Sequence, residues 1–449
     1  MNEQKDFIDN KIDDLGELAK KKLDSFQIAG FVRRNTVIGF YNSEINKSTS
    51  QNTSHLYLTA IKDQKVKTVE LALVDQESWK TVMETLVTQL TKATAGYRHP
   101  GFPKAKYSVD VPPVKDPELL LEETSQEKKA GLVEQVVNTI EITEKTARAS
   151  GSFETFEVYF RVMNSCGIDA SDETGYHHLK MTAKTRGGKG TGDEERYFKQ
   201  LKELAFEELA VRATMDSLAD TMAKKGESGQ FPVVLAPMAT QQLIRITAAI
   251  FNGYYHAQES ACLPHLEGEA LFDEQLNLVD DPLSSMTVFN ITIDGEGVAK
   301  HFYPLIDKGI PVGILHDMNT ASNAGVETSG HKNYPFMNHY HPGPAAYNLV
   351  LKDGNSDFEE MLSETKEGIL IKGFNDLNIE PLTGKISGFT SKGVFSIRNG
   401  EIDQPLKEYR VDGEILTVLK NIPLIGTVEE KGLFSGPYVK LGQLRLENV

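Results

Sequence analysis

Phe231-Pro-Val-Val-Leu-Ala236 is the stretch around which the fold of this chain is organised. Its apolar and β-branched residues predict a buried strand, and the segment after Pro237 predicts a helix. Thr240 is expected to cap the start of that helix. Asn252-Gly253 is expected to end it, because both residues tolerate the left-handed backbone conformation. The apolar residues that recur at the spacing of one helical face are Leu243, Ile246, Ala249 and Ile250.

A second strand is predicted in Asn277-Leu-Val-Asp-Asp-Pro282, where two carboxylates and a proline end the extended run. Beyond it, short strands spaced by Gly, Asn, Asp and Pro predict a β-rich region with many turns. Five further segments stand out, in this order: Asp294-Gly-Glu-Gly297, Ile306-Asp-Lys-Gly309, His316-Asp-Met-Asn-Thr-Ala321, Asn348-Leu-Val-Leu351 and Thr365-Lys-Glu-Gly-Ile-Leu370.

This ordered set resembles the TldD/PmbA family of intracellular peptidases, whose members are also called modulators of DNA gyrase. The family's TldD branch carries a zinc motif, HExxxH, on the helix, and a late cysteine completes its site. With Gly253 as the anchor, the positions that match these four residues are Ile244, Arg245, Ala249 and Ser435. Zinc needs imidazole, thiolate or carboxylate donors, and hydrolysis needs a carboxylate base. The resemblance therefore implies no metal ligand, catalytic residue or cofactor in this chain.

The chain thus resembles the other branch, PmbA/TldE, whose members are partners of the zinc-bearing subunit. The first hypothesis is a non-catalytic subunit of an intracellular metalloprotease that acts on unfolded peptides, with zinc in a TldD-like partner. Two alternatives stay open. The chain can be a metallopeptidase in its own right, with metal ligands that do not align with the family's motif. It can also be a stand-alone homodimeric protein with a peptide-binding or regulatory role. The expected partner is a TldD-like subunit or a second copy of the chain.

Composition narrows the class of protein. A chain of 449 residues exceeds what one hydrophobic core usually supports, so two domains are expected. Its net charge of −16 argues against direct binding of nucleic acid, which rests on clustered Lys and Arg. The two cysteines, Cys166 and Cys262, fit a reducing compartment. The charged N-terminus and the lack of a long apolar run predict a cytoplasmic location without membrane contact.

The first half is predicted to be antiparallel sheet with helices, including a strand through Phe156 to Val162 that turns at Asn164-Ser-Cys-Gly167. A long helix is predicted from Glu194 to about Lys224, with Asp193 as its cap. The polar exit after it favours a domain boundary near residue 227. The expected fold class is α+β: residues 1–227 form an N-terminal domain of antiparallel sheet with helices, and residues 228–449 form a β-rich domain with one central helix.

Several residues are candidates for a catalytic or metal-binding role. His339-Tyr-His341 places two imidazoles on one face of an extended segment, which makes it a weak alternative metal site. Asp280-Asp281 and Asp294 with Glu296 are paired acids, but aspartates beside proline and glycine more often make turns. Two roles stay open for Arg245. It can bind a peptide carboxylate or an acidic neighbour, or it can lie on a solvent-facing surface.

Other motifs give weaker evidence of a functional site. His177-His178 alternate faces if they lie in a strand, so they do not favour a shared ion. The glycine-rich Arg186–Asp193 segment lacks the spacing of a phosphate-binding loop and favours a hairpin connection. Ser356-Asp-Phe-Glu359 predicts a capping box, with Gly368 as the end of that helix.

Overall fold

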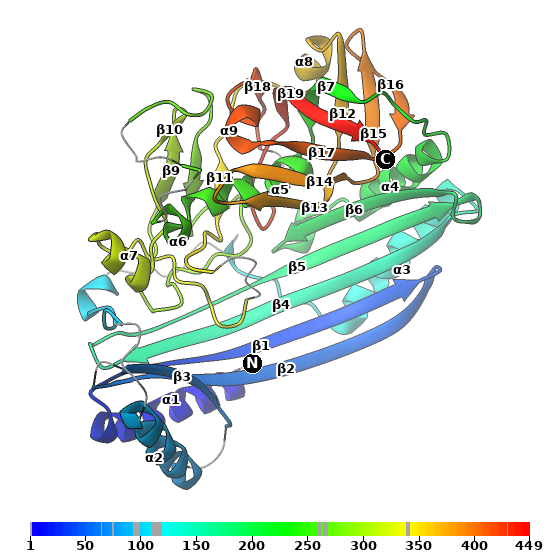
Figure 1. Cartoon of the computed structure of the whole chain (residues 1–449). Coiled ribbons are helices and arrows are strands. Elements are labelled where there is room, and N and C mark those ends of the chain that lie inside the picture. The colour runs from blue at the N-terminus through cyan, green and yellow to red at the C-terminus, as the bar shows by residue number, and fades with distance from the viewer. Residues whose placement is uncertain are drawn as a thin grey trace.

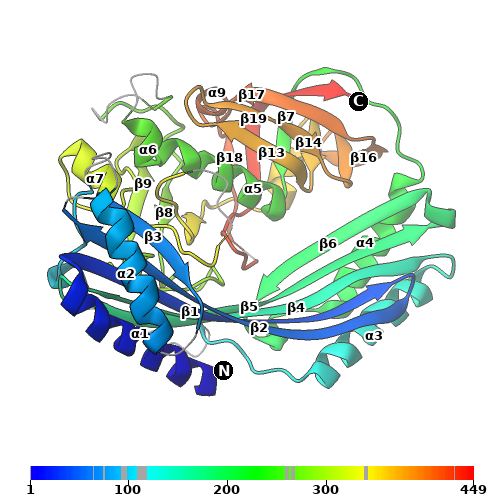
Figure 2. The same cartoon turned by 60° about the horizontal axis from the view of Figure 1, so that its bottom comes forward.

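The computed structural model describes residues 2–63, 65–73, 76–92, 99–108, 119–257, 262–263, 268–337, 342–428 and 430–449. A long curved sheet from the N-terminal half lies against a β-rich layer from the C-terminal half (Figure 1). Helices α1 and α3 lie on the side of the long sheet that faces away from this layer (Figure 2). The predicted α+β class is confirmed.

The N-terminal sheet has six antiparallel strands in the order β3-β2-β1-β4-β5-β6. The β1–β2 hairpin turns at Asn42 and Ser43, whose φ angles of 51° and 68° suit the tight turn that this hairpin requires. The turn predicted at Asn164 is confirmed, because its side chain accepts hydrogen bonds from the backbone N–H groups of Cys166 and Ile168. The strands are β1 Ser25–Tyr41, β2 Glu44–Lys62, β3 Lys65–Leu71, β4 Arg148–Asn164, β5 Asp169–Thr185 and β6 Gly190–Phe198.

Four helices pack on one face of this sheet through two apolar clusters. α1 (Asn2–Lys22) and α2 (Gln76–Lys92) share one cluster with the first half of β1 and the last part of β2. α3 (Gln126–Thr143) and α4 (Phe206–Asp220) share the other with the far end of the sheet. α3 begins where Ser125 accepts a hydrogen bond from the backbone of Lys128. Among the described residues, no helix is long and apolar enough to cross a membrane.

The helix predicted from Glu194 to about Lys224 is wrong in its first part. Residues 190–198 form strand β6, which pairs with β5, and helix α4 begins only at Phe206. Asp193 does not cap a helix, since its carboxylate accepts a hydrogen bond from Thr182 across the strand pair. The charged run hides the strand period, and pairing with a distant strand decides the conformation.

The C-terminal half forms two further sheets. A nine-stranded mixed sheet holds most of the strands, and a four-stranded antiparallel sheet has the order β10-β9-β8-β11. The larger sheet contains β7 Gly229–Leu235, β12 Glu367–Ile371, β13 Phe374–Glu380, β14 Lys385–Thr390, β15 Val394–Arg398, β16 Glu401–Leu406, β17 Tyr409–Glu414, β18 Leu424–Ile425 and β19 Val439–Asn448. The smaller contains β8 Leu278–Asp280, β9 Tyr303–Asp307, β10 Ile310–Pro311 and β11 Leu349–Leu351.

The predicted strand and helix at the centre of this half are confirmed as β7 and α5 (Pro237–Thr247). The predicted caps are wrong. Pro237 occupies the first turn of α5 and Ala236 precedes it, so Thr240 lies inside the helix. The helix continues as a 3₁₀ turn (Ala248–Phe251), and Gly253 opens the short helix α6 (Gly253–His256) instead of closing α5.

The other C-terminal helices are short, with α7 at Met318–Ala324, α8 at Phe358–Ser363 and α9 at Ile415–Val418. The predicted helix after Ser356 is confirmed, but Asp357 caps it by accepting from the backbone of Glu360. Gly368 does not end this helix, because it lies in strand β12. The longest helix of this half within the described residues is α5, in agreement with one central helix.

The two halves meet through an aromatic cluster. Phe31 and Phe160 from the long sheet contact Phe336, and Phe160 also contacts Tyr334. Asp172 of β5 adds a polar link, since its carboxylate accepts two hydrogen bonds from Thr292, both 2.6 Å. Because the cluster is buried and apolar, it fixes the C-terminal half at one end of the long sheet.

Candidate functional site

The four positions matched to the zinc motif lie in and beside helix α5. Ile244 is buried in the apolar core of the C-terminal half, and Ala249 packs against that core from the 3₁₀ turn. Arg245 donates a hydrogen bond to the carbonyl of Leu377 in β13, at 3.3 Å. Thus Ile244 points into the core while the arginine reaches the edge strand, and Arg245 is not a free solvent-facing side chain.

Ser435 lies in an extended segment, residues 430–438, which we call the strap. Its backbone pairs with Leu349 and Leu351 of β11, at 2.8 and 3.0 Å. Leu351 also lines the small apolar cavity that Ile244 faces, so the structure brings positions 244 and 435 to the neighbourhood of one strand. The Ser435 hydroxyl is fully buried and has no hydrogen-bond partner among the described residues.

The residues at these four positions do not fit a zinc ion. Ile244 and Ala249 carry no donor atom, and the guanidinium of Arg245 stays protonated at any pH a protein tolerates. The wall around Ile244 is made largely of leucine side chains. Throughout the described ranges, no group of three or more His, Cys, Asp and Glu side chains is arranged to hold a metal ion.

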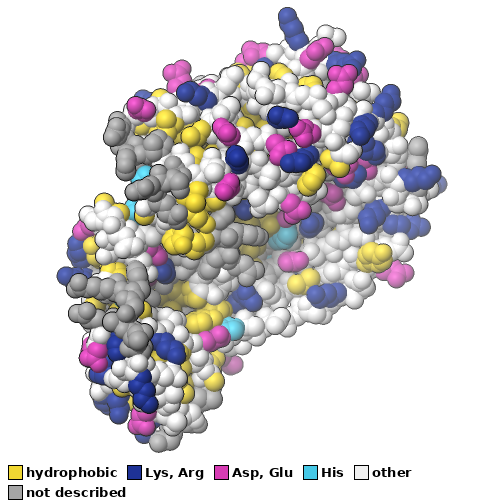
Figure 3. Space-filling view, in the orientation of Figure 1, with side chains coloured by type: hydrophobic (Ala, Val, Ile, Leu, Met, Phe, Trp, Pro, Cys, Tyr) yellow, Lys and Arg dark blue, Asp and Glu magenta, His cyan; other side chains and the backbone are white. Residues whose placement is uncertain are grey.

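A polar cleft of about 470 Å³ opens between the two halves, beside the N-terminus of α5. Figure 3 shows the molecule hollowed between the C-terminal layer and the long strands, with charged side chains around the hollow. Strand β6 is the edge of the N-terminal sheet and β13 is the edge of the large C-terminal sheet, and both line the cleft. The cleft is therefore walled by two unpaired strand edges.

Ion pairs across the cleft tie the strap to the N-terminal half. Glu430 pairs with Arg196 of β6 at 2.8 Å, and Lys431 pairs with Glu203 at 2.9 Å. Arg196 also pairs with the buried Glu194. Burial is the main cause that raises the pKa of Glu194, and the two neighbouring arginines oppose the rise. These pairs hold the segment that carries Ser435 against β6.

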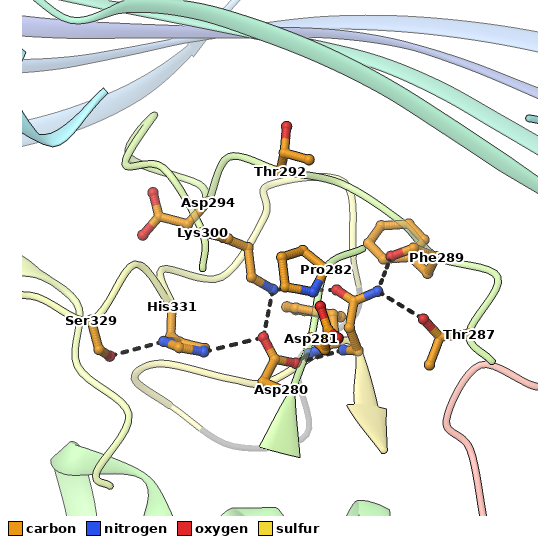
Figure 4. A network of polar contacts seen from close by, with 12 residues as sticks. Asp280, Asp281, Pro282, Thr287, Phe289, Thr292, Asp294, Lys300, Ser329 and His331 are labelled. Atoms are coloured by element: carbon orange, nitrogen blue, oxygen red, sulfur yellow. Dashed lines mark hydrogen bonds and ion pairs between the residues drawn. The ribbon is translucent and has the colours of Figure 1, made fainter. Parts of the chain in front are cut away.

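Asp280, a residue of the first paired-acid motif, is the centre of a fully buried charge network (Figure 4). Its carboxylate lies 3.0 Å from Lys300 Nζ and 3.2 Å from His331 Nε2. It also accepts hydrogen bonds from the backbone N–H groups of Tyr347 and Asn348, at 3.1 and 2.7 Å. Burial opposes ionisation, but Lys300, His331 and these backbone donors outweigh it and hold the pKa of Asp280 well below its usual range.

The second acid pair lies close by and is structural. Asp294 accepts hydrogen bonds from the backbone of Glu296 and Val298, both 2.9 Å, which closes a turn. Lys332 lies 3.8 Å from Glu296 and 2.9 Å from Asp317. The network and this cluster join several of the segments that carried the family resemblance, so those segments build the frame of the C-terminal half.

Burial raises the pKa of Glu296 to about 8, and Lys332 opposes this while the carboxylates of Asp294 and Asp317 add to it. The folded chain therefore holds a proton that the unfolded chain releases near pH 4.5. The contribution of Glu296 to the free energy of unfolding is therefore largest below pH 4.5 and is lost as the pH rises toward 8. We expect Glu296→Gln to remove at least about 1 kcal/mol of this loss.

The measurement is urea unfolding at several pH values from 5 to 8, with the exposed Glu401→Gln as the matched control. The wild type and the control should show the same pH dependence, and the stability of Glu296→Gln relative to both should rise from pH 5 to pH 8. Parallel curves for all three proteins would show that Glu296 is ionised in the folded chain.

The histidine hypotheses have separate outcomes. His339 and His341 lie outside the described residues. His177 and His178 lie in β5 on opposite faces, as predicted: His177 is buried, 2.9 Å from Thr155 Oγ1, and His178 pairs with Glu195. Burial lowers the pKa of His177 to about 4. Sequence reasoning missed Lys300 and His331 as partners of Asp280, since nothing in their spacing marks them.

Comparisons with known proteins show which family this chain is similar to. Residues 228–448 match the family model described as the PmbA/TldA metallopeptidase C-terminal domain. The chain is 26% identical over 328 residues to a metalloprotease of Methanothermobacter thermautotrophicus, covering 71% of this chain and 68% of that protein. It is 25% identical over 339 residues to a TldD homolog of Haemophilus influenzae, covering 72% and 69%. The C-terminal half is thus of the metallopeptidase-related class.

Two solved structures share the fold over nearly the whole chain. TldE from Thermococcus kodakarensis superposes with a TM-score of 0.85 at 19% identity, covering 98% of this chain and all of that one. A Thermotoga maritima protein described as a modulator of a DNA gyrase gives 0.81 at 20% identity, covering 98% and 99%. The chain belongs to the TldD/PmbA family, as the resemblance in its sequence predicted.

Proposed function

We propose that this chain is the non-catalytic, PmbA/TldE-like subunit of a cytoplasmic metalloprotease, with the zinc ion held by a TldD-like partner. We further propose that it divides at residue 227 into an α+β domain and a β-rich domain. The observation that carries the proposal is the set Ile244, Arg245, Ala249 and Ser435. These residues offer no zinc donor set, while the chain shares the fold of TldE over nearly its whole length.

The environment of these residues supports a scaffold role. Ile244 is 4% exposed and packs with core residues of several strands, so the position contributes to stability. Arg245 ties α5 to β13, the strand that edges the cleft. A chain is expected to keep the family's fold without the zinc ligands if its function depends on the surface of that fold.

The cleft suits an extended peptide. A peptide can add to an unpaired strand edge through main-chain hydrogen bonds, which supply affinity with little sequence preference. At the start of β13, however, the side chain of Gln242 already bonds both the N–H and the carbonyl of Phe374, at 2.7 and 3.0 Å. A bound peptide would therefore pair with β13 from Asn375 onward, and it would have to displace Arg245 from the carbonyl of Leu377.

Hydrogen exchange with a bound unfolded peptide is expected to protect residues 375–380 of β13, because their edge amides would gain partners. Strand β16, the opposite edge of the same sheet, serves as the internal control and should exchange unchanged. Protection confined to the N-terminal helices would count against a peptide bound as an added strand.

The partner is tested by pull-down from the native cell with a tagged chain, followed by a peptidase assay of the eluate. We expect a TldD-like subunit bearing HExxxH and activity that a chelator abolishes. A stable interface buries roughly 1,600 Å² or more, so the complex should survive gel filtration at micromolar concentration. If the chain runs as a monomer and recovers no such subunit, the proposal of a protease subunit should be abandoned for that of a regulatory protein.

The homodimeric alternative predicts a different result in the same experiment. A second copy of the chain would be recovered in place of a TldD-like subunit, and the eluate would have no chelator-sensitive activity. The remaining alternative, a peptidase with its own ligands, predicts activity of the chain alone and is tested by its metal content.

A further inference from the structure

A second polar cavity, of about 200 Å³, lies between the start of α3 and strands β1, β2 and β4. Helix α3, which covers this cavity, lies on the side of the long sheet that faces away from the C-terminal layer (Figure 2). Val32 belongs to the apolar cluster under α1 and Ile38 to the cluster under α3, so Arg34 and Thr36 lie in a polar gap between them. Ser50 and Thr155 flank Thr36 on the neighbouring strands.

Lys129 of α3 reaches into this cavity and is only 3% exposed. Its ammonium donates to Thr36 Oγ1 at 2.7 Å. No carboxylate of the described residues lies within ion-pair distance of it, in contrast to the equally buried Lys300, which has Asp280 at 3.0 Å. An ammonium has three donors, and a buried charge without a counter-charge is costly. Lys129 is therefore a buried cation with donors to spare.

Arg34, Glu157 and Glu122 have partners of their own, and Glu123, which also lines the cavity, is solvent-exposed. Arg34 binds Glu157 through two hydrogen bonds, at 2.5 and 2.7 Å. Glu122 accepts from Lys128 Nζ at 3.1 Å and from the backbone of Leu201 at 2.8 Å. Burial lowers the pKa of Lys129 to about 8, although Glu157 opposes the shift. These partners leave Lys129 as the group that an added anion would satisfy.

We propose that this cavity binds a carboxylate, from a small free acid or from the end of a peptide chain, with Lys129 as its counter-charge and Thr36 as a second donor. The volume admits a group of that size. Glu122, Glu123 and Glu157 line the same cavity, so a doubly charged anion such as phosphate would be repelled more strongly than a monovalent carboxylate. The site lies on the other face of the sheet from the cleft and does not depend on the proposed subunit role.

The test compares the full-length wild type with Lys129→Met and Lys145→Met in acetate and in chloride at equal ionic strength. Methionine keeps the length of the side chain without its charge, and Lys145, just after α3, is exposed and does not line the cavity, so it controls for the loss of a positive charge. Saturating acetate is expected to raise the melting temperature of the wild type and of Lys145→Met by about 2 °C or more. Lys129→Met should show no acetate response and should be the more stable protein in chloride.

Two further arms complete the test. N-acetylglycine offers the same carboxylate on a chain end: a response to it supports a chain-end ligand, and a response to acetate alone supports a small free acid. NMR of lysine-labelled wild type should show two ammonium groups with strongly lowered midpoints, because burial lowers the pKa of Lys129 to about 8 and that of Lys199 to about 7. The midpoint near 8 should rise with acetate, and the midpoint near 7 should not. No acetate response, an equal response in Lys129→Met, or a larger response to phosphate would overturn the proposal.

Discussion

Replacing Asp280 by asparagine is expected to destabilise the chain by about 3–5 kcal/mol, the cost of removing one partner from a buried ion pair. Asp280 is fully buried and faces Lys300, which is 2% exposed. Asparagine would leave that ammonium without a counter-charge. Its amide N–H₂ group would also face donors, because four N–H groups now point at the carboxylate. The measurement is urea unfolding of the wild type and the variant.

The matched control is the next residue in the chain. Asp281 accepts a hydrogen bond from the backbone of Leu283 in a turn, and asparagine can accept the same bond. We expect Asp281→Asn to change stability by less than about 0.5 kcal/mol. The double variant Asp280→Asn with Lys300→Met should be less destabilised than the sum of the single changes, since it removes both charges. Equal stability of Asp280→Asn and Asp281→Asn would show that the buried pair contributes little.

Dialysed preparations of the chain alone are expected to hold well below one zinc ion per chain and to hydrolyse no peptide. The reason is the donor chemistry at positions 244, 245, 249 and 435, where none of the residues replaces imidazole, carboxylate or thiolate. Elemental analysis gives the metal content, and a peptidase assay with and without chelator gives the activity. A TldD-like subunit bearing HExxxH, purified in the same way, is the positive control.

One tightly bound zinc ion per chain would contradict this expectation and favour the peptidase alternative. The histidines to change would then be His339 and His341, which the sequence marks as the remaining ligand-like pair. Loss of the metal in a variant with both residues changed to alanine would locate the site there.

The sequence predicted elements whose signals are local. Strand β7 and helix α5 follow from a β-branched run, a proline and apolar residues at helical spacing, and the structure has both. The predicted caps of α5 are wrong because the residues that cap a helix depend on the path of the chain into and out of it. Pro237 starts α5 at its first turn, and Asn252 caps the next helix through the backbone of Tyr254.

Long-range pairing was beyond the sequence. Residues 190–198 are charged and glycine-bearing, so no window of the chain marks them as a strand, yet pairing with β5 makes them one. The same limit applies to the cleft, since β6 and β13 become its two edges only when the sheets are stacked.

What the sequence by itself determined is the family, the α+β class and the residue types at the four positions of the zinc motif, because these depend on residue identity and order. Only the tertiary structure decided what the charged residues do. In the sequence, Asp280 is one of two paired acids beside a proline, a pattern that favours a turn over a catalytic or ligand role. It becomes the centre of a buried network because folding brings Lys300 and His331 to it. Lys129 is one of many lysines in the sequence, and folding buries it beside Thr36, in a polar cavity and without a carboxylate within ion-pair distance.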